Sequence, residues 1–232
     1  SSMNRAQRTK LFRLLLRPRV VINWLVARYS SHYQKDIVQS RPVTLRIAPA
    51  NLCNYGCLFC EIHKDDAIWP KRSKNILNVG HIKFFSEFLR GAYRLDFCGG
   101  SAEPLLAKEF GEIVIYLKKA FGLVLGVTTN ASTISEKLAK TLVAWRFDHL
   151  LVSYHAGTRD GYRWLMTGDI DKVNTNIERI TTIKNKNRRR EPVVKFNFAL
   201  HRENKEEFEA VLNQAEKLHV QAVQVSKYYG GF

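Results

Sequence analysis

Ala48-Pro-Ala-Asn-Leu-Cys-Asn-Tyr-Gly-Cys-Leu-Phe-Cys60 decides the fold, and it directly follows a short apolar run. Cys53, Cys57 and Cys60 have the spacing C-x3-C-x2-C, which places three thiols on one tight loop. Thiolates suit zinc and iron–sulfur clusters alike. Structural zinc sites usually begin with a C-x2-C pair and end with a second pair far along the chain. Since Cys98 is the only other cysteine, the spacing favours a four-iron cluster with one iron left open, and zinc remains the alternative.

The loop resembles the cluster-binding loop of the radical S-adenosylmethionine (SAM) superfamily, including Asn54 after the first cysteine and Phe59 before the third. The resemblance implies that Cys53, Cys57 and Cys60 ligate a [4Fe-4S] cluster whose open iron is chelated by SAM. It also implies that one electron from the cluster cleaves SAM to methionine and a 5′-deoxyadenosyl radical, which abstracts hydrogen from a bound substrate. An external donor such as flavodoxin or ferredoxin is then expected to supply the electron.

A glycine-rich segment, Phe97-Cys-Gly-Gly-Ser-Ala-Glu-Pro-Leu-Leu106, is similar to the family's GxGEPLL segment. The resemblance implies that the amino end of SAM is held by Gly99, Gly100, Ser101, Ala102 and Glu103. Glycines let the backbone approach a ligand closely, and a carboxylate can accept hydrogen bonds from a cationic amine. Ala102 stands where the family often has Gly, so the ligand would approach more tightly there. The alternative is an ordinary strand–loop–helix turn.

Two further segments resemble SAM-binding turns of the family. Val127-Thr-Thr-Asn-Ala-Ser132 is similar to its TNG turn, which adds Asn130 to the SAM contacts. Leu150-Leu-Val-Ser-Tyr-His-Ala-Gly157 is similar to a strand end at which Ser153 would meet the ribose or carboxylate of SAM. His155 stands where many relatives carry Asp, and we expect a hydrogen-bonded strand-end histidine rather than a proton-transfer group.

Relatives often carry an arginine that meets the SAM carboxylate at the position of Met166. Arg163 lies one helical turn earlier and is expected on the same face, so we assign it this contact. Cys98 is the only spare thiol that could donate a hydrogen atom after abstraction, although a buried, small hydrophobic role is the expectation that we favour for it.

Hydrophobic periodicity predicts an alternation of strands and helices. Strand patterns fall near residues 43–48, 93–98, 123–127, 148–153, 192–199 and 220–225. Helical patterns fall near residues 79–91, 107–120, 134–145, 159–184 and 203–218. Such alternation implies an α/β fold of parallel strands with right-handed crossovers. Six strands match the partial (β/α)6 TIM-like barrel of the resembled family, and the motifs lie at the carboxyl ends of strands, where such folds place their sites.

Composition and length predict one core domain, 43–232, after a basic extension, 1–42. The 232 residues are 45% hydrophobic and can bury one substantial core. Ser1-Ser-Met3 is expected to be a remnant of the expression vector ahead of the native start. Four cysteines, three of them clustered, make no disulfide scaffold, and a cluster needs reduced thiols. A reducing cytoplasm is therefore the expected compartment.

The basic extension, 1–42, holds nine Lys and Arg against one Asp, half of the formal net charge of +16. Its apolar runs predict two short amphipathic helices hinged at Pro18. No run reaches the ~18 apolar residues of a membrane span. A helical cap over the bottom of the barrel, peripheral docking on an anionic membrane and RNA binding all remain open.

The substrate is left open by the sequence, with a ribosomal peptide or a sugar-type small molecule as the expectation. Epimerisation, oxidation, crosslinking and methylation are equally open. Many relatives continue past the sixth strand into a cysteine-rich SPASM or twitch domain, whereas this sequence ends at Phe232. We therefore expect either a shortened chain or a compact member with one cluster. The alternative from another class is a non-catalytic, zinc-stabilised binding module with a basic nucleic-acid- or membrane-binding arm.

Overall fold

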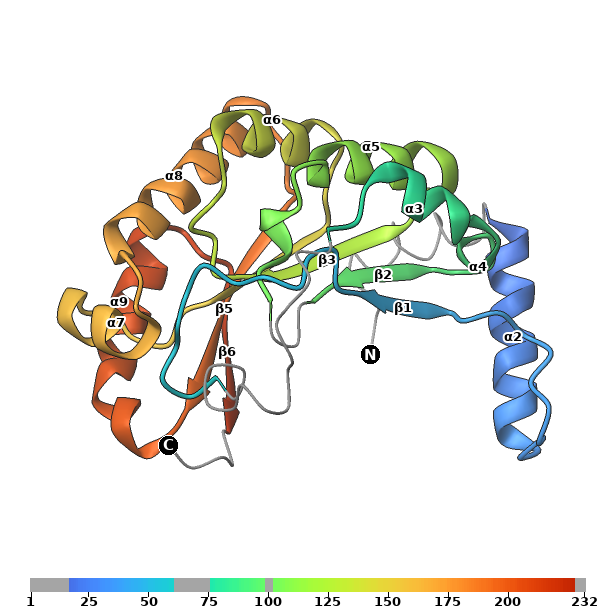
Figure 1. Cartoon of the computed structure of the whole chain (residues 1–232), viewed down its shortest axis with the longest axis horizontal. Helices are drawn as coiled ribbons and strands as arrows, with labels where there is room; N and C mark the ends of the chain where they lie inside the picture. The colour runs from blue at the N-terminus through green and yellow to red at the C-terminus, as the bar shows by residue number, and fades with distance from the viewer. Residues whose placement is uncertain (1–16, 61–75, 99–101, 228–232) are drawn as a thin grey trace.

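The computed structural model describes residues 17–60, 76–98 and 102–227 (Figure 1). Six strands form one sheet in the order β1-β2-β3-β4-β5-β6, and each neighbouring pair is parallel. The strands are β1 (Thr44–Ile47), β2 (Arg94–Phe97), β3 (Val124–Thr129), β4 (His149–Ser153), β5 (Val193–Leu200) and β6 (Ala222–Lys227). The α/β fold and all six expected strands are confirmed. Sequential order with same-handed crossovers places the connecting helices on one face, so the sheet curls into a partial barrel.

Figure 1 shows the helices that follow β1 to β5 gathered over the outer face of the sheet. They are α3 (Val79–Phe84), α4 (Ser86–Leu89), α5 (Phe110–Phe121), α6 (Glu136–Ala144), α7 (Arg159–Met166), α8 (Ile170–Lys186) and α9 (Phe208–Lys217), with the 3-10 turns η2 (Pro104–Leu106) and η3 (Arg202–Glu207). Strand residues alternate accordingly: Leu95 and Phe97 are buried under helices, whereas Arg94 and Asp96 are only half-buried on the inner face.

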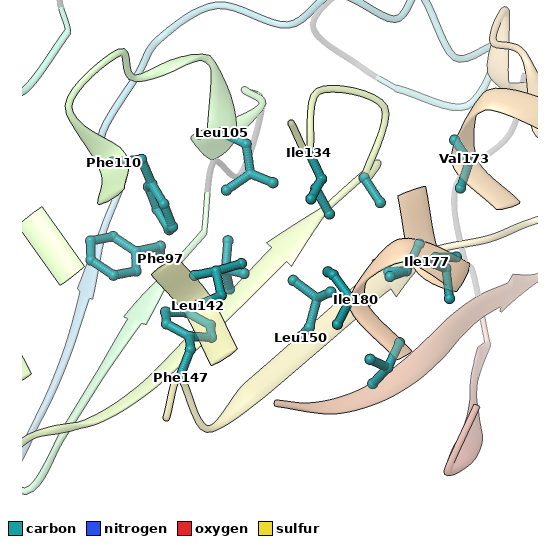
Figure 2. Close-up of a cluster of buried hydrophobic side chains, with 14 of the residues drawn as sticks. Phe97, Leu105, Phe110, Ile134, Leu142, Phe147, Leu150, Val173, Ile177 and Ile180 are labelled. Carbon is teal, nitrogen blue, oxygen red and sulfur yellow. The ribbon is translucent and has the colours of Figure 1, made fainter. Parts of the chain in front are cut away.

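The core lies between the outer face of the sheet and the helices (Figure 2). Phe97 of β2 meets Phe110 of α5 at 4.8 Å between ring centroids, and Leu150 of β4 is fully buried. Ile177 and Ile180 of α8 continue the same cluster. The apolar stripe of each helix thus has a strand beneath it, which is why the helical period of 3.6 residues is visible in the sequence.

One expected helix, 159–184, is two helices in the structure. Thr167 ends α7 in a left-handed conformation with φ 54°, and Asp169 caps α8 by accepting from the N–H groups of Asp171 and Lys172. A left-handed residue followed at once by an Asp N-cap stops one helix and starts the next. The expected helix at 79–91 is likewise divided, into α3 and α4.

The described part of the basic extension contains α2 (Pro18–His32), which begins at the expected proline. Arg17 donates to the carbonyls of Ala92 and Gly122 at 3.1 and 3.2 Å, so the first turns lie at the amino ends of the strands. This position agrees with a cap over the bottom of the barrel. The first expected helix falls within residues 1–16, outside the described residues.

The expectation that α2 is amphipathic is wrong, because apolar side chains lie on both of its faces. Val20 is buried against the body, whereas Ile22 and Leu25 are exposed. Within the residues that the structure describes, no helix combines the length and the apolar character needed to cross a membrane.

Asn23 joins α2 to the body through three hydrogen bonds. Its amide nitrogen donates to the carbonyls of Arg41 and Gly91, both at 3.0 Å, and its oxygen accepts from the Arg41 N–H at 2.8 Å. We expect Asn23→Ala to lower the free energy of unfolding by about 2 kcal/mol, measured by urea titration. Asn185→Ala, at an exposed helical position of α8, is the matched control, and equal effects of the two changes would show that these bonds do not anchor α2.

Candidate functional site

The motif residues converge on one edge of the sheet, at the carboxyl ends of the strands. The cysteine loop follows β1, Cys98 follows β2, Asn130 follows β3 and Ser153 ends β4. Because neighbouring strands are parallel and in register, these ends lie side by side. This edge is where parallel α/β folds bind ligands.

The cysteine loop is fastened to the end of α7. The Gly56 N–H donates to Thr167 Oγ1 at 2.6 Å, and the Leu58 N–H donates to the carbonyl of Leu165 at 3.0 Å. Both partners belong to the last turn of α7, more than 100 residues away in the sequence. The break between α7 and α8 therefore holds the loop that carries the thiols. Sequence reasoning missed this contact, since no local pattern links the two segments.

Two further contacts strengthen the same attachment. The Cys57 thiol lies 3.6 Å from the carbonyl of Met166. Tyr55 packs on Gly168, where an added Cβ would lie only 2.3 Å from the tyrosine ring. Glycine at this position permits the close approach that seats the loop.

The three thiols are close enough to influence one another. Burial, and secondarily the neighbouring Cys53 and Cys60, raise the pKa of Cys57 to about 12. Thiolates so placed need a cation to compensate their charge. Among the described residues, no group of three or more His, Cys, Asp or Glu converges on a point where one metal ion would fit. Three thiols on one loop are a donor set that suits an iron–sulfur cluster and zinc alike.

Glu103 is buried, with 2% of its surface exposed, and its carboxylate ties two motifs together. Oε1 accepts from Leu105 N–H at 3.0 Å and from Thr129 Oγ1 at 2.5 Å, and Oε2 accepts from Asn130 N–H at 2.7 Å. Its own N–H donates to the carbonyl of Leu52 at 2.7 Å, beside the first cysteine. Burial raises the pKa of this carboxyl, and these hydrogen bonds oppose the shift.

Asn130 reaches back to the cysteine loop. Its side-chain nitrogen donates to Asn54 Oδ1 at 3.0 Å, and the Asn54 nitrogen donates to Ser132 Oγ at 2.8 Å. Together with Glu103 and Thr129, these residues form what we call the motif network: Asn54, Glu103, Thr129, Asn130 and Ser132. It joins the cluster loop, the glycine-rich segment and the turn after β3. The expected SAM contacts of Glu103 and Asn130 stay predictions, and both side chains also have this structural role.

Ser153 and His155 differ in their freedom to meet a ligand. Ser153 is half-buried, and its hydroxyl makes no hydrogen bond to any other residue of the described part of the chain. His155 is buried and accepts from the Ala199 N–H through Nδ1 at 3.0 Å. Its ring also stands edge-on to Phe59 of the cysteine loop, with centroids 4.9 Å apart. The structure thus shows His155 as the hydrogen-bonded strand-end residue that we expected.

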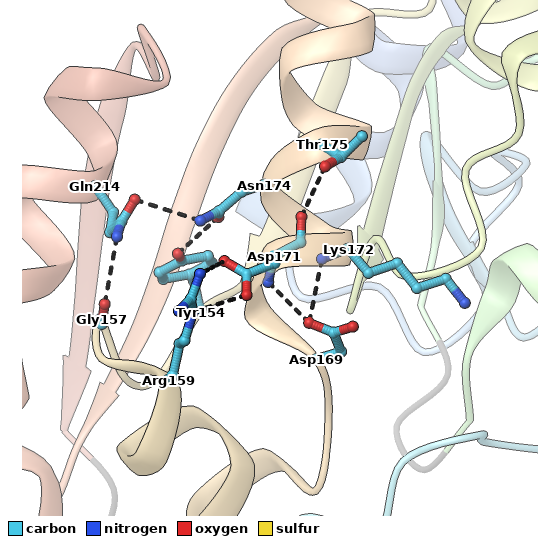
Figure 3. A network of polar contacts seen from close by, with 9 residues as sticks. All are labelled: Tyr154, Gly157, Arg159, Asp169, Asp171, Lys172, Asn174, Thr175 and Gln214. Atoms are coloured by element: carbon cyan, nitrogen blue, oxygen red, sulfur yellow. Dashed lines mark hydrogen bonds and ion pairs between the residues drawn. The ribbon is translucent and has the colours of Figure 1, made fainter.

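The segment after β4 is held by a polar network from two helices (Figure 3). Tyr154 donates to Asn174 of α8 at 2.8 Å, and Asn174 and Gln214 connect it to the carbonyl of Gly157. An added Cβ at Gly157 would lie 2.3 Å from the backbone of α9, so this position requires glycine. These contacts fix the strand end that presents Ser153.

The other predicted site residues take no part in the motif network. Arg163 is exposed on α7 and Met166, three residues later in the same helix, is buried. The expected contact of Arg163 with the SAM carboxylate stays a prediction. Cys98 is half-buried and follows the inner-facing Asp96 by two residues, so the expectation of a buried, small hydrophobic residue is wrong. Ala102 is half-buried. Gly99, Gly100 and Ser101 lie outside the described residues.

The buried His155 predicts a pH dependence of stability. Burial, and secondarily His201, lower its pKa from 6.5 to about 3. Between pH 6.5 and 3, His155 is therefore protonated in the unfolded chain and neutral in the folded chain. The stability present above pH 6.5 is lost as the pH falls toward 3. We expect His155→Asn, which keeps an acceptor, to reduce the slope of unfolding free energy against pH by about 1.4 kcal/mol per unit in this window.

Urea unfolding of the metal-free chain across that window measures the slope. His32→Asn, on the exposed last turn of α2, is the control and should leave the slope unchanged. An unchanged slope in His155→Asn would mean that the pKa of His155 is not lowered in the folded chain.

Comparisons with known proteins agree with this geometry. The model of the radical SAM superfamily matches residues 47–215, more than half of the chain. Proteins named probable GTP 3′,8-cyclase are similar: that of Metallosphaera sedula is 27% identical over 180 residues, covering 76% of this chain and 52% of the relative. That of Saccharolobus solfataricus is 30% identical over 182 residues, covering 77% and 54%. The chain thus spans about half the length of these curated relatives.

Solved structures show the same fold at low identity. Streptococcus suis SuiB bound to S-adenosylmethionine superposes with a TM-score of 0.68 at 15% identity, covering 87% of this chain and 44% of SuiB. Native anSMEcpe with bound AdoMet superposes with a TM-score of 0.63 at 19% identity, covering 80% and 51%. Since the family model spans the cysteine loop, the motif network and the segment after β4, this chain belongs to the radical SAM superfamily.

Proposed function

We propose that this chain is the radical-generating core of an enzyme in which Cys53, Cys57 and Cys60 hold a [4Fe-4S] cluster. When bound, the cluster and SAM supply the 5′-deoxyadenosyl radical that abstracts hydrogen from the substrate. The observation that carries the proposal is the three-thiol loop, fastened on one side by the end of α7 and on the other by the motif network. A rigid loop keeps three ligands in place while the fourth iron position is left for SAM.

The residues of the chain have separate tasks in this proposal. The motif network orients the turn after β3 and the segment that begins at Glu103, which together border the SAM site. Ser153, whose hydroxyl has no other partner among the described residues, contacts the ribose or carboxylate of SAM. His155, neutral because burial lowers its pKa, packs beside Phe59 and helps to exclude water from the cluster loop.

A small anionic substrate is favoured by the inner face of the sheet. Two basic residues lie at inner-facing positions of the sheet: Arg46 of β1, paired with Asp96, and Lys195 of β5, paired with Leu151. Neither forms an ion pair with an acidic residue of the described ranges. Asp96 is already neutralised by Arg94, through bonds of 2.7 and 2.8 Å. The inner face therefore has an excess of positive charge that a phosphate-bearing molecule would compensate.

This charge, together with relatives named GTP 3′,8-cyclase, supports a phosphorylated, sugar-type small molecule over a ribosomal peptide. The structural neighbours crystallised with peptides share too little sequence to carry the peptide assignment. We further propose that flavodoxin or ferredoxin supplies the electron and that the enzyme works in a reducing cytoplasm. Cys98, on the inner face, is retained as a candidate hydrogen donor.

The cluster assignment predicts 5′-deoxyadenosine. After anaerobic reconstitution and reduction, the chain with added SAM should release 5′-deoxyadenosine, detected by mass spectrometry, with about four irons bound per chain. Cys57→Ala removes one ligand and should abolish the product. Cys98→Ala, a matched loss of one thiol outside the loop, should keep both the iron and the product. Zinc in place of iron, or product from Cys57→Ala, would contradict the assignment.

The inner-face charge predicts affinity for a polyphosphate. Isothermal titration with GTP should show binding that Lys195→Gln weakens by about tenfold, because one charge-assisted hydrogen bond is lost. Lys172→Gln, whose side chain points away from the neighbouring network in Figure 3, is the control and should bind GTP unchanged. Equal affinities for GTP and for guanosine would show that the inner face does not bind the phosphate groups. That result would leave the cluster assignment intact.

A further inference from the structure

Exposed apolar side chains gather on the segment from α2 to the start of β1. Of the fifteen large hydrophobic residues that are exposed in the described ranges, seven lie between residues 22 and 38. Four of them repeat at helical spacing and form what we call the outward stripe: Ile22, Leu25, Tyr29 and Tyr33, exposed by 60%, 53%, 56% and 58%. Scattered surface hydrophobics are ordinary, but a contiguous group marks an interaction site.

The outward stripe faces away from the protein. At 100° per residue, its members fall within one arc of about 80° of the helix. Val20 lies opposite this arc, and Asn23 and Ser30 lie about 100–120° from its centre. Val20 and Ser30 are buried, and Asn23 is bonded to Gly91 and Arg41 of the body. The other side of the helix is therefore already packed on the body. Rotation of α2 about its axis would break these contacts, so it cannot bury the stripe.

Positive charge borders the outward stripe. Arg19, Arg28 and Lys35 are exposed beside it, and Asp36 is the only acidic residue between residues 17 and 42. Arg28 lies over the ring of Trp24 at 5.1 Å from its centroid. Trp24, Arg28, Tyr29 and Tyr33 also line a shallow hollow on this surface. Aromatic rings and arginine stems with polar ends suit the boundary between water and lipid.

We propose that the outward stripe docks α2 on an anionic lipid surface, with the helix lying along the membrane. The combination of charge and apolar side chains selects this occupant. A second copy packed on the same stripe would bring the basic residues Arg19, Arg28 and Lys35 close to the same basic residues of its partner, and the like charges would repel. Residues 1–16 carry four basic residues and no acidic one, so they too would add like charge. Nucleic acid would satisfy the arginines but leave Ile22 and Leu25 in water. Anionic lipid satisfies both, because its headgroups pair with the basic side chains and its acyl region receives the apolar ones.

The location of α2 fits this role. Its first turns lie at the amino ends of β2 and β3, through the bonds from Arg17 to Ala92 and Gly122, whereas the thiol loop lies at the carboxyl ends. Docking through α2 thus leaves the candidate SAM edge of the sheet directed away from the lipid. The proposal does not depend on the reaction that the site performs.

Co-sedimentation with vesicles tests the proposal. The reconstituted chain should bind vesicles of phosphatidylglycerol and phosphatidylcholine at low salt and not vesicles of phosphatidylcholine alone. Leu25→Glu should weaken binding by about tenfold, because it removes an inserted side chain and adds repulsion. Leu212→Glu makes the same change at an exposed position of α9 and should bind like the unchanged chain.

A second pair of variants isolates charge. Arg19→Gln/Arg28→Gln should lose about tenfold or more in affinity for the anionic vesicles, since each basic residue near the surface contributes several-fold. Lys186→Gln/Arg190→Gln removes two exposed charges between the end of α8 and the start of β5 and should have little effect. Circular dichroism and 5′-deoxyadenosine release, both expected to be unchanged, confirm that the variants are folded.

Three outcomes would overturn the proposal. Equal losses in Leu25→Glu and Leu212→Glu would show a non-specific effect. Light scattering that reveals a dimer broken by Leu25→Glu, with no vesicle binding, would assign the stripe to a second copy. Binding of a structured RNA that depends on Arg19 and Arg28 but not on Leu25, again without vesicle binding, would assign the surface to nucleic acid.

Discussion

The buried carboxylate of Glu103 is the contact on which the arrangement of the candidate site depends. Strand order brings the ends of β1, β2 and β3 to one edge, but it does not fix the loops that leave them. Glu103 does so by accepting from Thr129 and Asn130 while its own N–H reaches the carbonyl of Leu52. A buried carboxylate is costly unless its oxygens are hydrogen-bonded. The same cost makes alternative positions of these loops unfavourable.

The second constraint is the junction between α7 and α8. Its left-handed Thr167 and the following Gly168 stop one helix and provide a seat for the cysteine loop. The loop is thus held from two directions, by β3 through Asn130 and by α7 through Thr167. Ligands for a cluster then need little reorganisation on binding, which is the usual benefit of a rigid supporting shell.

Local periodicity and motif spacing are enough to predict the strands, most helices and the thiol loop. Strands such as β5 are predicted by the alternation of apolar and polar residues, and helices such as α5 by an apolar stripe of period 3.6. The spacing C-x3-C-x2-C alone marks the three thiols as a ligand set. Long-range partners were not predictable: nothing near Gly56 points to Thr167, and nothing near Asn54 points to Ser132. The uninterrupted helix at 159–184 was a wrong prediction because apolar periodicity outweighed the short Thr-Gly-Asp signal.

The sheet is open, because the described pairings run from β1 to β6 without closing on each other. A closed eight-stranded barrel fills its interior with its own side chains, whereas this sheet keeps a polar inner face bordered by two strand edges. Within the described residues, β6 pairs with β5 alone, and most side chains of β6 are exposed. Because the sheet is open, segments placed along the β6 edge can change the surroundings of the inner face. The thiol loop, held by β3 and α7, stays undisturbed by such changes.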